Sequence, residues 1–521
     1  MSKVGLFIAI LLLCLGCSEG AGHDTDGDAS EKDNDNILSD GDAESLSGLF
    51  KNPHDGKLYV AAGYKTITPN DQNHPCAKYM GGTGSGRLSE GIHDDLEARA
   101  FVMEQDGVHA VLVSLDLIGW IVTNADNVMN ELEKLGVNRN SVIISSTHTH
   151  TAADSLGVFG PDYNTSGACP EYHQFLRTTI VELVTELSTK MLPVTVTAAE
   201  KEIDEKDANH PELTNDLRLP FVTNKHLTAA RFVDSENKTV ATLVNYHPHP
   251  ETMIEKNVYS ADFPRWTRKK VEDEFGGTCV YFSGTVGGMA TPLGLNVPER
   301  DADGKPVMKD GKPVIVEEDG ERKCYSMGYL LGENVIDLLK QASVIDSRLI
   351  LDFEPVDLPL ENPIFALAFN MGILEPYDKA FEDKEKCGPF FCLPMNFIHI
   401  QLGILHFVHM PGEVLAESSV GREASHVDYA AECEENGVKG CEKDCGVKEY
   451  PAIVGYRNSL PQGHLLMELG LGNNEIGYIL PESDYMCNSH PHYYEEYFTV
   501  SKSMEKLVRE NVSKLLERSE K

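Results

Sequence analysis

The chain has 521 residues and a formal net charge of −37, with 45 Lys and Arg against 82 Asp and Glu. This acidic excess argues against nucleic acid or an anionic membrane surface as the main partner, because phosphate contacts need clustered Lys and Arg. The content of 41% hydrophobic residues is ordinary for a globular protein, and the length allows a large core.

Residues 1–17 are typical of a bacterial lipoprotein signal peptide. Lys3 gives a positive start, and the apolar segment Val4 to Leu15 is shorter than the about 20 residues that span a bilayer. The segment ends in a lipobox-like Cys17, although Cys14 replaces the usual leucine, so an ordinary cleaved signal is the alternative. We expect export to the cell envelope with a lipid anchor on Cys17, in the outer membrane or on the cell surface, and otherwise secretion.

Residues 18–50 are predicted to form a disordered acidic tether. They contain ten Asp and Glu against one lysine, and too few apolar residues to form a core. Residues 51–521 are assigned to one catalytic domain, with insertions at about 298–322 and 428–450. The first insertion repeats an Asp-Gly-Lys-Pro-Val segment, which predicts a hairpin, and the second is rich in cysteine and charge.

Strands alternate with helices through this domain, which predicts an α/β fold with central β-sheets flanked by helices. Runs rich in Val, Ile and Leu give the expected strands 58–62, 100–104, 110–115, 142–144, 194–198, 227–233, 240–244, 280–282 and 404–408. Longer runs with helical periodicity give the expected helices 124–135, 171–192, 264–275, 327–342, 413–424 and 501–516.

Ten cysteines remain once Cys14 and Cys17 are set aside, and an even number outside the cytoplasm predicts disulfides. Loops that short disulfides would stabilise contain the local pair Cys387 and Cys392 and, further along, the cluster of Cys433, Cys441 and Cys445. A zinc knuckle is the alternative for the cluster, although its spacings do not match a C-x2-C unit. The connectivity stays open among Cys76, Cys169, Cys279, Cys324, Cys387, Cys392, Cys433, Cys441, Cys445 and Cys487.

Two pairs of histidines follow predicted strands. His148 and His150 come directly after one β-branched run, and His247 and His249 come after another. A His-x-His pair at a strand end can direct both imidazoles into one cleft, and imidazole is a common zinc ligand. The two pairs together favour a metal site over histidines at the surface.

Nine short motifs follow one another along residues 55–500. They are 62–69 AGYKTITP, 79–82 YMGG, 91–102 GIHDDLEARAFV, 113–116 VSLD, 147–150 THTH, 245–250 NYHPHP, 260–264 SADFP, 411–413 PGE and 476–478 IGY. Each motif alone is weak, but the series in this order resembles the neutral (alkaline) ceramidase family. The resemblance covers nearly the whole predicted domain.

The resemblance implies a zinc amidase whose Zn²⁺ is bound by two His, one Glu and one Tyr. It assigns these positions to His148, His249, Glu413 and Tyr478. His247 remains the alternative to His249, because both lie in the same motif. Glu413 is expected in a turn that opens a helix. Mixed nitrogen and oxygen ligands would leave zinc able to bind and acidify a water molecule.

The resemblance also implies catalytic roles outside the ligand set. His150 would accept or deliver a proton, and Tyr494, or the adjacent Tyr493, would donate to the developing oxyanion. Family members carry a Gly-Asp-Val-Ser-Pro loop whose serine is assigned a catalytic role. Here the loop reads Gly-Met-Ala-Thr-Pro, so Thr291 stands where the serine does and Met289 replaces the aspartate. A simple tight turn is the alternative for this loop.

The function predicted from these residues is hydrolysis of an amide bond, in an N-acyl lipid of the ceramide type or a smaller relative. Related ceramidases carry a C-terminal immunoglobulin-like domain that is not expected here, so the substrate stays open. One alternative is a cell-surface lipoprotein that keeps the fold and the zinc but binds without cleaving. Another is an amidohydrolase barrel, in which His-x-His also follows a strand.

Overall fold

The computed structural model describes residues 48–70, 72, 74–204, 211–287, 290–429, 447–485 and 494–519. The predicted signal peptide, Cys17 and residues 18–47 of the predicted tether lie outside this part of the chain. Leu49 and Phe50, at the end of the predicted tether, pack against the first core cluster. The described residues from Leu49 onwards form one compact unit.

The first sheet has the strand order β5-β4-β3-β1-β6. Strands β3 and β4 are buried over most of their length because both of their faces are covered, and a tight Asp106-Gly107 turn with positive φ at both residues joins them. Strands β4 and β5 are parallel, whereas β1, β3 and β4 are antiparallel neighbours. The strands are β1 (Tyr59–Thr66), β3 (Glu97–Gln105), β4 (Val108–Leu115), β5 (Val142–Ser146) and β6 (Leu192–Pro193).

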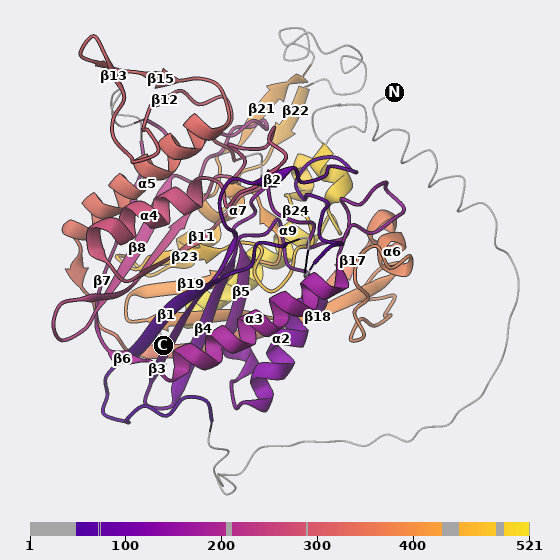
Figure 1. Ribbon diagram of the computed structural model, residues 1–521. Helices are drawn as coiled ribbons and strands as arrows, with labels where there is room; N and C mark the ends of the chain where they lie inside the picture. The colour runs from indigo at the N-terminus through magenta and orange to yellow at the C-terminus, as the bar shows by residue number, and fades with distance from the viewer. Residues whose placement is uncertain are drawn as a thin grey trace, which may run out of the picture. The chain divides into compact units, whose positions relative to one another are not determined.

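Two helices, α2 (Val122–Lys134) and α3 (Pro170–Ser188), cover one face of this sheet (Figure 1). Their buried residues recur at helical spacing, as in Leu176, Ile180 and Leu183, and join side chains of β3 and β4 in one core cluster. Helix α3 ends four residues before Leu192, which the sequence prediction had included in the helix and which lies instead in β6.

The second sheet has the order β11-β9-β8-β7-β16. Strands β9 and β11 are parallel, and β8 is antiparallel to both β7 and β9. Helices α4 (Phe263–Phe275) and α5 (Glu321–Lys340) pack together on its outer face (Figure 1). The strands are β7 (Thr195–Glu202), β8 (His226–Val233), β9 (Thr239–Tyr246), β11 (Thr278–Ser283) and β16 (Ser343–Val344).

The third sheet has the order β17-β18-β19-β23, with α6 (Pro363–Asn370) and α9 (Met504–Arg518) contributing to the cluster on one of its faces. The long antiparallel pair of β17 and β18 was not predicted. Both strands contain proline. Proline argues against a strand in the sequence, because it lacks the N–H that donates to the neighbouring strand. The strands are β17 (Leu349–Leu360), β18 (Phe391–Leu402), β19 (Leu405–His409) and β23 (Leu465–Leu469).

The inner faces of the three sheets share one apolar core. Phe101 of β3, Phe232 of β8 and Ile400 of β18 are fully buried in it. The larger sheets of the described residues are thus three open sheets with helices outside, which confirms the predicted α/β class. They do not form the barrel of the third alternative. No helix in the described residues is long and apolar enough to cross a membrane.

The three sheets meet at a junction made by Ser145 of β5, Ser283 of β11 and Gly470 after β23. The Ser283 hydroxyl donates to the carbonyl of Thr147 at 2.6 Å, and the Gly470 N–H donates to the carbonyl of Ser283 at 2.9 Å. The Ser145 hydroxyl donates to the carbonyl of Gly470. This three-sheet junction lies directly before the histidines His148 and His150.

Small β-pairs connect the remaining segments. The predicted hairpin of the first insertion is present as β13 (Met308–Lys309) and β14 (Lys312–Pro313), and the second insertion begins and ends in β21 (Ser425–Asp428) and β22 (Val447–Tyr450). The helix predicted for 413–424 is wrong. Its first residues form β20 (Glu413–Val414), paired with β24 (Tyr478–Ile479), and only α7 (Ala416–Val420) is helical. The other short pairs are β2 (Gly91–Ile92) with β10 (Val258–Tyr259), and β12 (Val297–Pro298) with β15 (Ile315–Val316).

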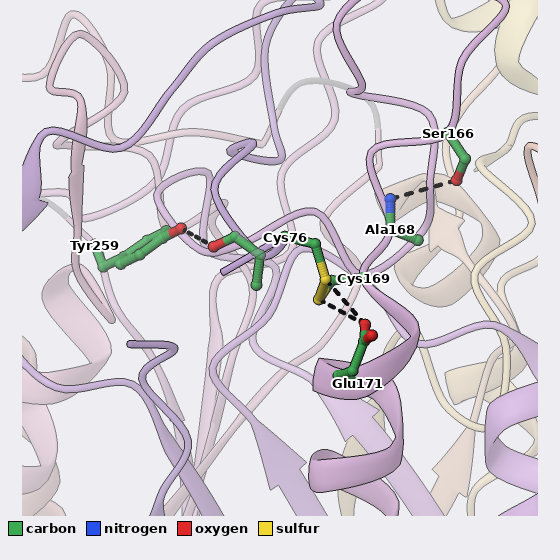
Figure 2. Close-up of a disulfide and its surroundings, with 7 residues drawn as sticks. Cys76, Ser166, Ala168, Cys169, Glu171 and Tyr259 are labelled. Carbon is green, nitrogen blue, oxygen red and sulfur yellow. Dashed lines mark hydrogen bonds between the residues drawn. A yellow bond between two sulfur atoms is a disulfide. The ribbon is translucent and has the colours of Figure 1, made fainter. Parts of the chain in front are cut away.

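Two disulfides are present among the described residues, as the even cysteine count predicted. Cys76 pairs with Cys169 at the start of α3, beside the Glu171 carboxylate (Figure 2), and Cys387 pairs with Cys392. The disulfide prediction does not hold for all cysteines, since two are free and buried in the core: Cys279 and Cys324. The others lie outside the described residues: Cys433, Cys441, Cys445 and Cys487.

Replacing Cys76 and Cys169 by serine should lower the free energy of unfolding by about 2–5 kcal/mol. This disulfide joins residues 93 apart in sequence, so it strongly restricts the unfolded chain. The matched control is the double serine variant of Cys387 and Cys392, which are 5 residues apart and should lose about 2 kcal/mol less. Urea denaturation of the three proteins measures the difference, and equal losses would contradict the argument.

Candidate functional site

The turn after β5 directs His148 and His150 to the same side. The N–H of His148 donates to the carbonyl of Leu117 at 3.0 Å, and His148 adopts a left-handed conformation with φ 69°. This conformation is uncommon for a residue other than glycine and turns the chain sharply. As a result the two imidazoles lie with their ring centroids 5.0 Å apart.

The turn after β9 brings His249 to the same point. Its N–H donates to the carbonyl of Ala290 at 2.8 Å, and its Nδ1 lies 2.8 Å from the same oxygen. The ring centroid of His249 lies 4.8 Å from that of His148 and 5.4 Å from that of His150. One nitrogen from each of the three rings lies within 4.8 Å of the others. All three histidines are buried.

Glu413 completes this cluster from a third segment. Its Oε2 lies 3.1 Å from Nε2 of His249 and 3.4 Å from Nε2 of His148. Glu413 is held in the short strand β20, directly opposite Tyr478 of the parallel strand β24. The predicted third and fourth ligands are therefore neighbours across one β-pair, and Glu413 does not stand at the start of a helix.

The Tyr478 hydroxyl lies 3.2 Å from the hydroxyl of Tyr494. Burial, followed by the charge of Glu413, raises the pKa of Tyr478 well above its usual value, and burial also raises the pKa of Tyr494. Both phenols are therefore protonated at neutral pH and can donate hydrogen bonds. Tyr493, the alternative to Tyr494, lies outside the described residues.

Buried charges in this cluster compensate one another. Burial raises the pKa of Glu413, but His148 and His249 outweigh it and hold the pKa well below its usual range. Burial lowers the pKa of His249, but its hydrogen bond to Glu413 and the charge of Glu251 outweigh burial and raise it to about 9. Burial, with the charges of His148 and His249, lowers the pKa of His150 well below its usual value.

The sequence prediction did not include Glu251. This buried acid receives a hydrogen bond from the Thr291 hydroxyl, and its Oε2 lies 3.9 Å from Nδ1 of His150. The sequence carries a signal for it, since Glu251 follows His249 by two residues in the same turn. Thr291 thus lies beside the histidine cluster, whereas Met289 lies outside the described residues.

His247 does not join this cluster. Its Nδ1 accepts the Thr285 N–H at 3.0 Å, and its Nε2 lies 3.7 Å from Oε2 of Glu468. Burial lowers its pKa to about 4, so the ring is neutral. Of the two alternatives in the motif 245–250, the structure therefore brings His249, and not His247, to Glu413.

The residues of the cluster fit a metal ion. Ligand atoms about 2.0–2.1 Å from a tetrahedral ion lie about 3.3 Å apart, similar to the separations between Glu413 and its two histidines. Both ring nitrogens of His150 lack a hydrogen-bond partner among the described residues. An imidazole and carboxylate set of this kind suits zinc and other first-row divalent ions.

Comparisons with known proteins agree with the motif series. Residues 71–280 match the family described as "Neutral/alkaline non-lysosomal ceramidase, N-terminal", which confirms the predicted resemblance. Neutral ceramidase from Pseudomonas aeruginosa has a similar structure, with a TM-score of 0.61 over 89% of this chain and 75% of that chain, at 14% identity. A structure described as a ceramidase complexed with C2 matches with the same score and identity, over 89% and 76%.

At 14% identity these structures show a shared neutral ceramidase fold and nothing finer. No curated protein sequence matches the chain.

Metal binding should release a proton at pH 7. In the metal-free protein His249 has a pKa of about 9 and so carries a proton at pH 7, which it must lose to coordinate an ion. The affinity for a divalent ion should therefore rise as the pH increases towards about 9. Calorimetric titration with Zn²⁺ in two buffers of different ionisation enthalpy measures the protons released, and a value of zero would contradict this assignment.

His249→Asn should lose most of the bound metal, whereas His247→Asn should keep it. The side-chain amide of asparagine lies near the position that Nδ1 has in histidine. Asparagine can therefore keep the Nδ1 contact of each residue, with Ala290 or with Thr285, and it removes only Nε2. In His249 that atom faces Glu413, and in His247 it faces Glu468. Metal content after dialysis, with circular dichroism as the check on folding, distinguishes the two.

Proposed function

We propose that the protein, whose residues 71–280 match the neutral/alkaline ceramidase family, is a zinc-dependent hydrolase of the amide bond of an N-acyl lipid. The convergence of His148, His150 and His249 on one point, with Glu413 beside two of them, is the observation that supports this most. The description of both similar structures as ceramidases supports a ceramide-like substrate.

His148, His249 and Glu413 would hold the ion, with Tyr478 as the fourth ligand. A zinc ion there supplies Lewis-acid activation of the scissile carbonyl and of water. The short strands β20 and β24 fix Glu413 and Tyr478 relative to each other, so the oxygen ligands would need little rearrangement on binding.

His150 would be the general acid and base of the reaction. Both of its ring nitrogens lack a hydrogen-bond partner among the described residues, so the neutral imidazole could accept the proton of the attacking water and deliver it to the leaving amine. The protonated hydroxyl of Tyr494 would donate to the oxyanion that develops on the carbonyl oxygen.

Release of free fatty acid from a panel of N-acyl lipids and smaller N-acyl amines tests this function. We expect turnover that depends on added Zn²⁺ and stops with a chelator. Zinc binding without fatty acid release from any of them would instead support the non-catalytic zinc-binding lipoprotein.

Thr291→Ala should retain turnover within about tenfold of the wild type, whereas His150→Ala should lose about 10²- to 10⁴-fold. If zinc-activated water attacks the carbonyl, the Thr291 hydroxyl, which donates to Glu251, would only orient the site. Parallel kinetics of the two variants, with zinc content checked, measures this difference. If Thr291→Ala is inactive but still contains zinc, the threonine would be assigned the role of nucleophile.

We also propose that the protein is exported and anchored by a lipid on Cys17, which would hold the hydrolase at a membrane surface. The support is the short apolar segment before Cys17 and the acidic stretch after it. Radiolabelled palmitate should be incorporated in a bacterial host and should be absent from Cys17→Ser. Label-free mature protein recovered entirely in the soluble fraction would instead indicate secretion.

A further inference from the structure

Glu251 is a buried acid that the family resemblance leaves without a role. It is 5% exposed and follows His249 by two residues. Its two carboxylate oxygens face different residues, Oε1 towards Thr291 and Oε2 towards His150. A buried carboxylate is costly unless its oxygens are paired, so both contacts bear on its function.

On one side, Glu251 fixes the orientation of the Thr291 hydroxyl. The Thr291 Oγ1 accepts the N–H of Leu293 at 3.0 Å and donates its single proton to Glu251. The backbone of Thr291 is held as well, since its N–H and carbonyl both pair with Asn215, at 2.8 and 2.9 Å. The hydroxyl proton is therefore committed to Glu251 and cannot serve a substrate oxyanion at the same time.

On the other side, Glu251 faces an imidazole that has no other partner. Neither ring nitrogen of His150 has a hydrogen-bond partner among the described residues, and the side chain is buried. The Nδ1 lies 3.9 Å from Oε2 of Glu251, longer than a hydrogen bond. Hydrogen bonds at catalytic sites are often long in the unliganded protein and shorten when substrate binds.

The backbone keeps His150 and Glu251 in register. The N–H of His150 donates to the carbonyl of Pro250 at 3.1 Å, and the N–H of Glu251 donates to the carbonyl of His249 at 3.0 Å. The turn that carries His249 into the cluster therefore also carries the acid that faces His150.

We propose that Glu251 is a positioning residue that sets the tautomer of His150, keeping its proton on Nδ1 and leaving Nε2 free to exchange a proton with the substrate. The Oε1 of Glu251 already accepts the Thr291 hydroxyl and its Oε2 faces Nδ1 of His150, so an acceptor oxygen lies opposite Nδ1 and pairs with it when Nδ1 carries the hydrogen. The use of this tautomer in amide hydrolysis rests on the proposed function, but the tautomer itself does not.

Glu251→Gln tests the proposal sharply. The amide oxygen of glutamine can still accept the Thr291 hydroxyl, but its NH₂ group would face His150 as a donor and would move the proton to Nε2. Two-dimensional ¹⁵N–¹H NMR of the purified protein with labelled histidine, with and without added Zn²⁺, reports the tautomer of each ring. We expect a proton on Nδ1 of His150 in the wild type and on Nε2 in Glu251→Gln.

His247 is the internal control in the same spectra. Its Nδ1 accepts the Thr285 N–H, so its proton should lie on Nε2 in every variant. Glu251→Asp, which keeps a carboxylate, should keep the Nδ1 proton of His150, and the wild-type spectrum itself tests the tautomer if the glutamine variant does not fold. An unchanged His150 tautomer in Glu251→Gln, or an Nε2 proton in the wild type or in Glu251→Asp, would overturn the proposal.

Kinetics adds a second readout. Glu251→Gln should lower kcat about 10²-fold with KM changed by less than about threefold, because acid–base efficiency and not binding is lost. Zinc content should be unchanged, since Glu251 is not among the proposed ligands. A fall in kcat with no change of tautomer would reject the positioning role, whereas an inactive wild type would reject the proposed function and leave the NMR test intact.

Discussion

The candidate site depends on the three-sheet junction of Ser145, Ser283 and Gly470. Each hydrogen bond there joins the end of one sheet to the end of another. The Ser283 hydroxyl fixes the carbonyl of Thr147, the residue before His148, so the turn that carries the histidines starts from a set position. Serine suits this task because its short side chain reaches a neighbouring carbonyl without displacing the apolar core around it.

The cluster beyond the junction buries a carboxylate and three imidazoles, which is unfavourable unless the charges are matched. In the metal-free protein the proton on His249 matches the charge of Glu413. The same oxygen of Glu413 faces both His249 and His148, so a cation placed there would take over the role of that proton. The site is thus preorganised for positive charge in both states.

The sequence predicted the parts of the fold with a strong local pattern. The β-branched runs before His148 and His249 form strands, and the amphipathic segments form α2 to α5 close to the expected bounds. The prediction failed where tertiary pairing decides the structure, as at Glu413, whose backbone pairs with Tyr478 across a long sequence separation. Glu251 was missed for the same reason, because its contact with Thr291 becomes visible only when two distant loops meet.

The residues brought together at the site are spread from His148 to Tyr494, and Glu413 and Tyr478 reach it only through a β-pair between separate segments. Contacts between residues so far apart in sequence form slowly, because long loops must close first. A nascent chain that has not yet been synthesised as far as Tyr478 lacks both tyrosines and half of the β-pair that holds Glu413. The candidate site therefore cannot assemble until most of the chain has been made.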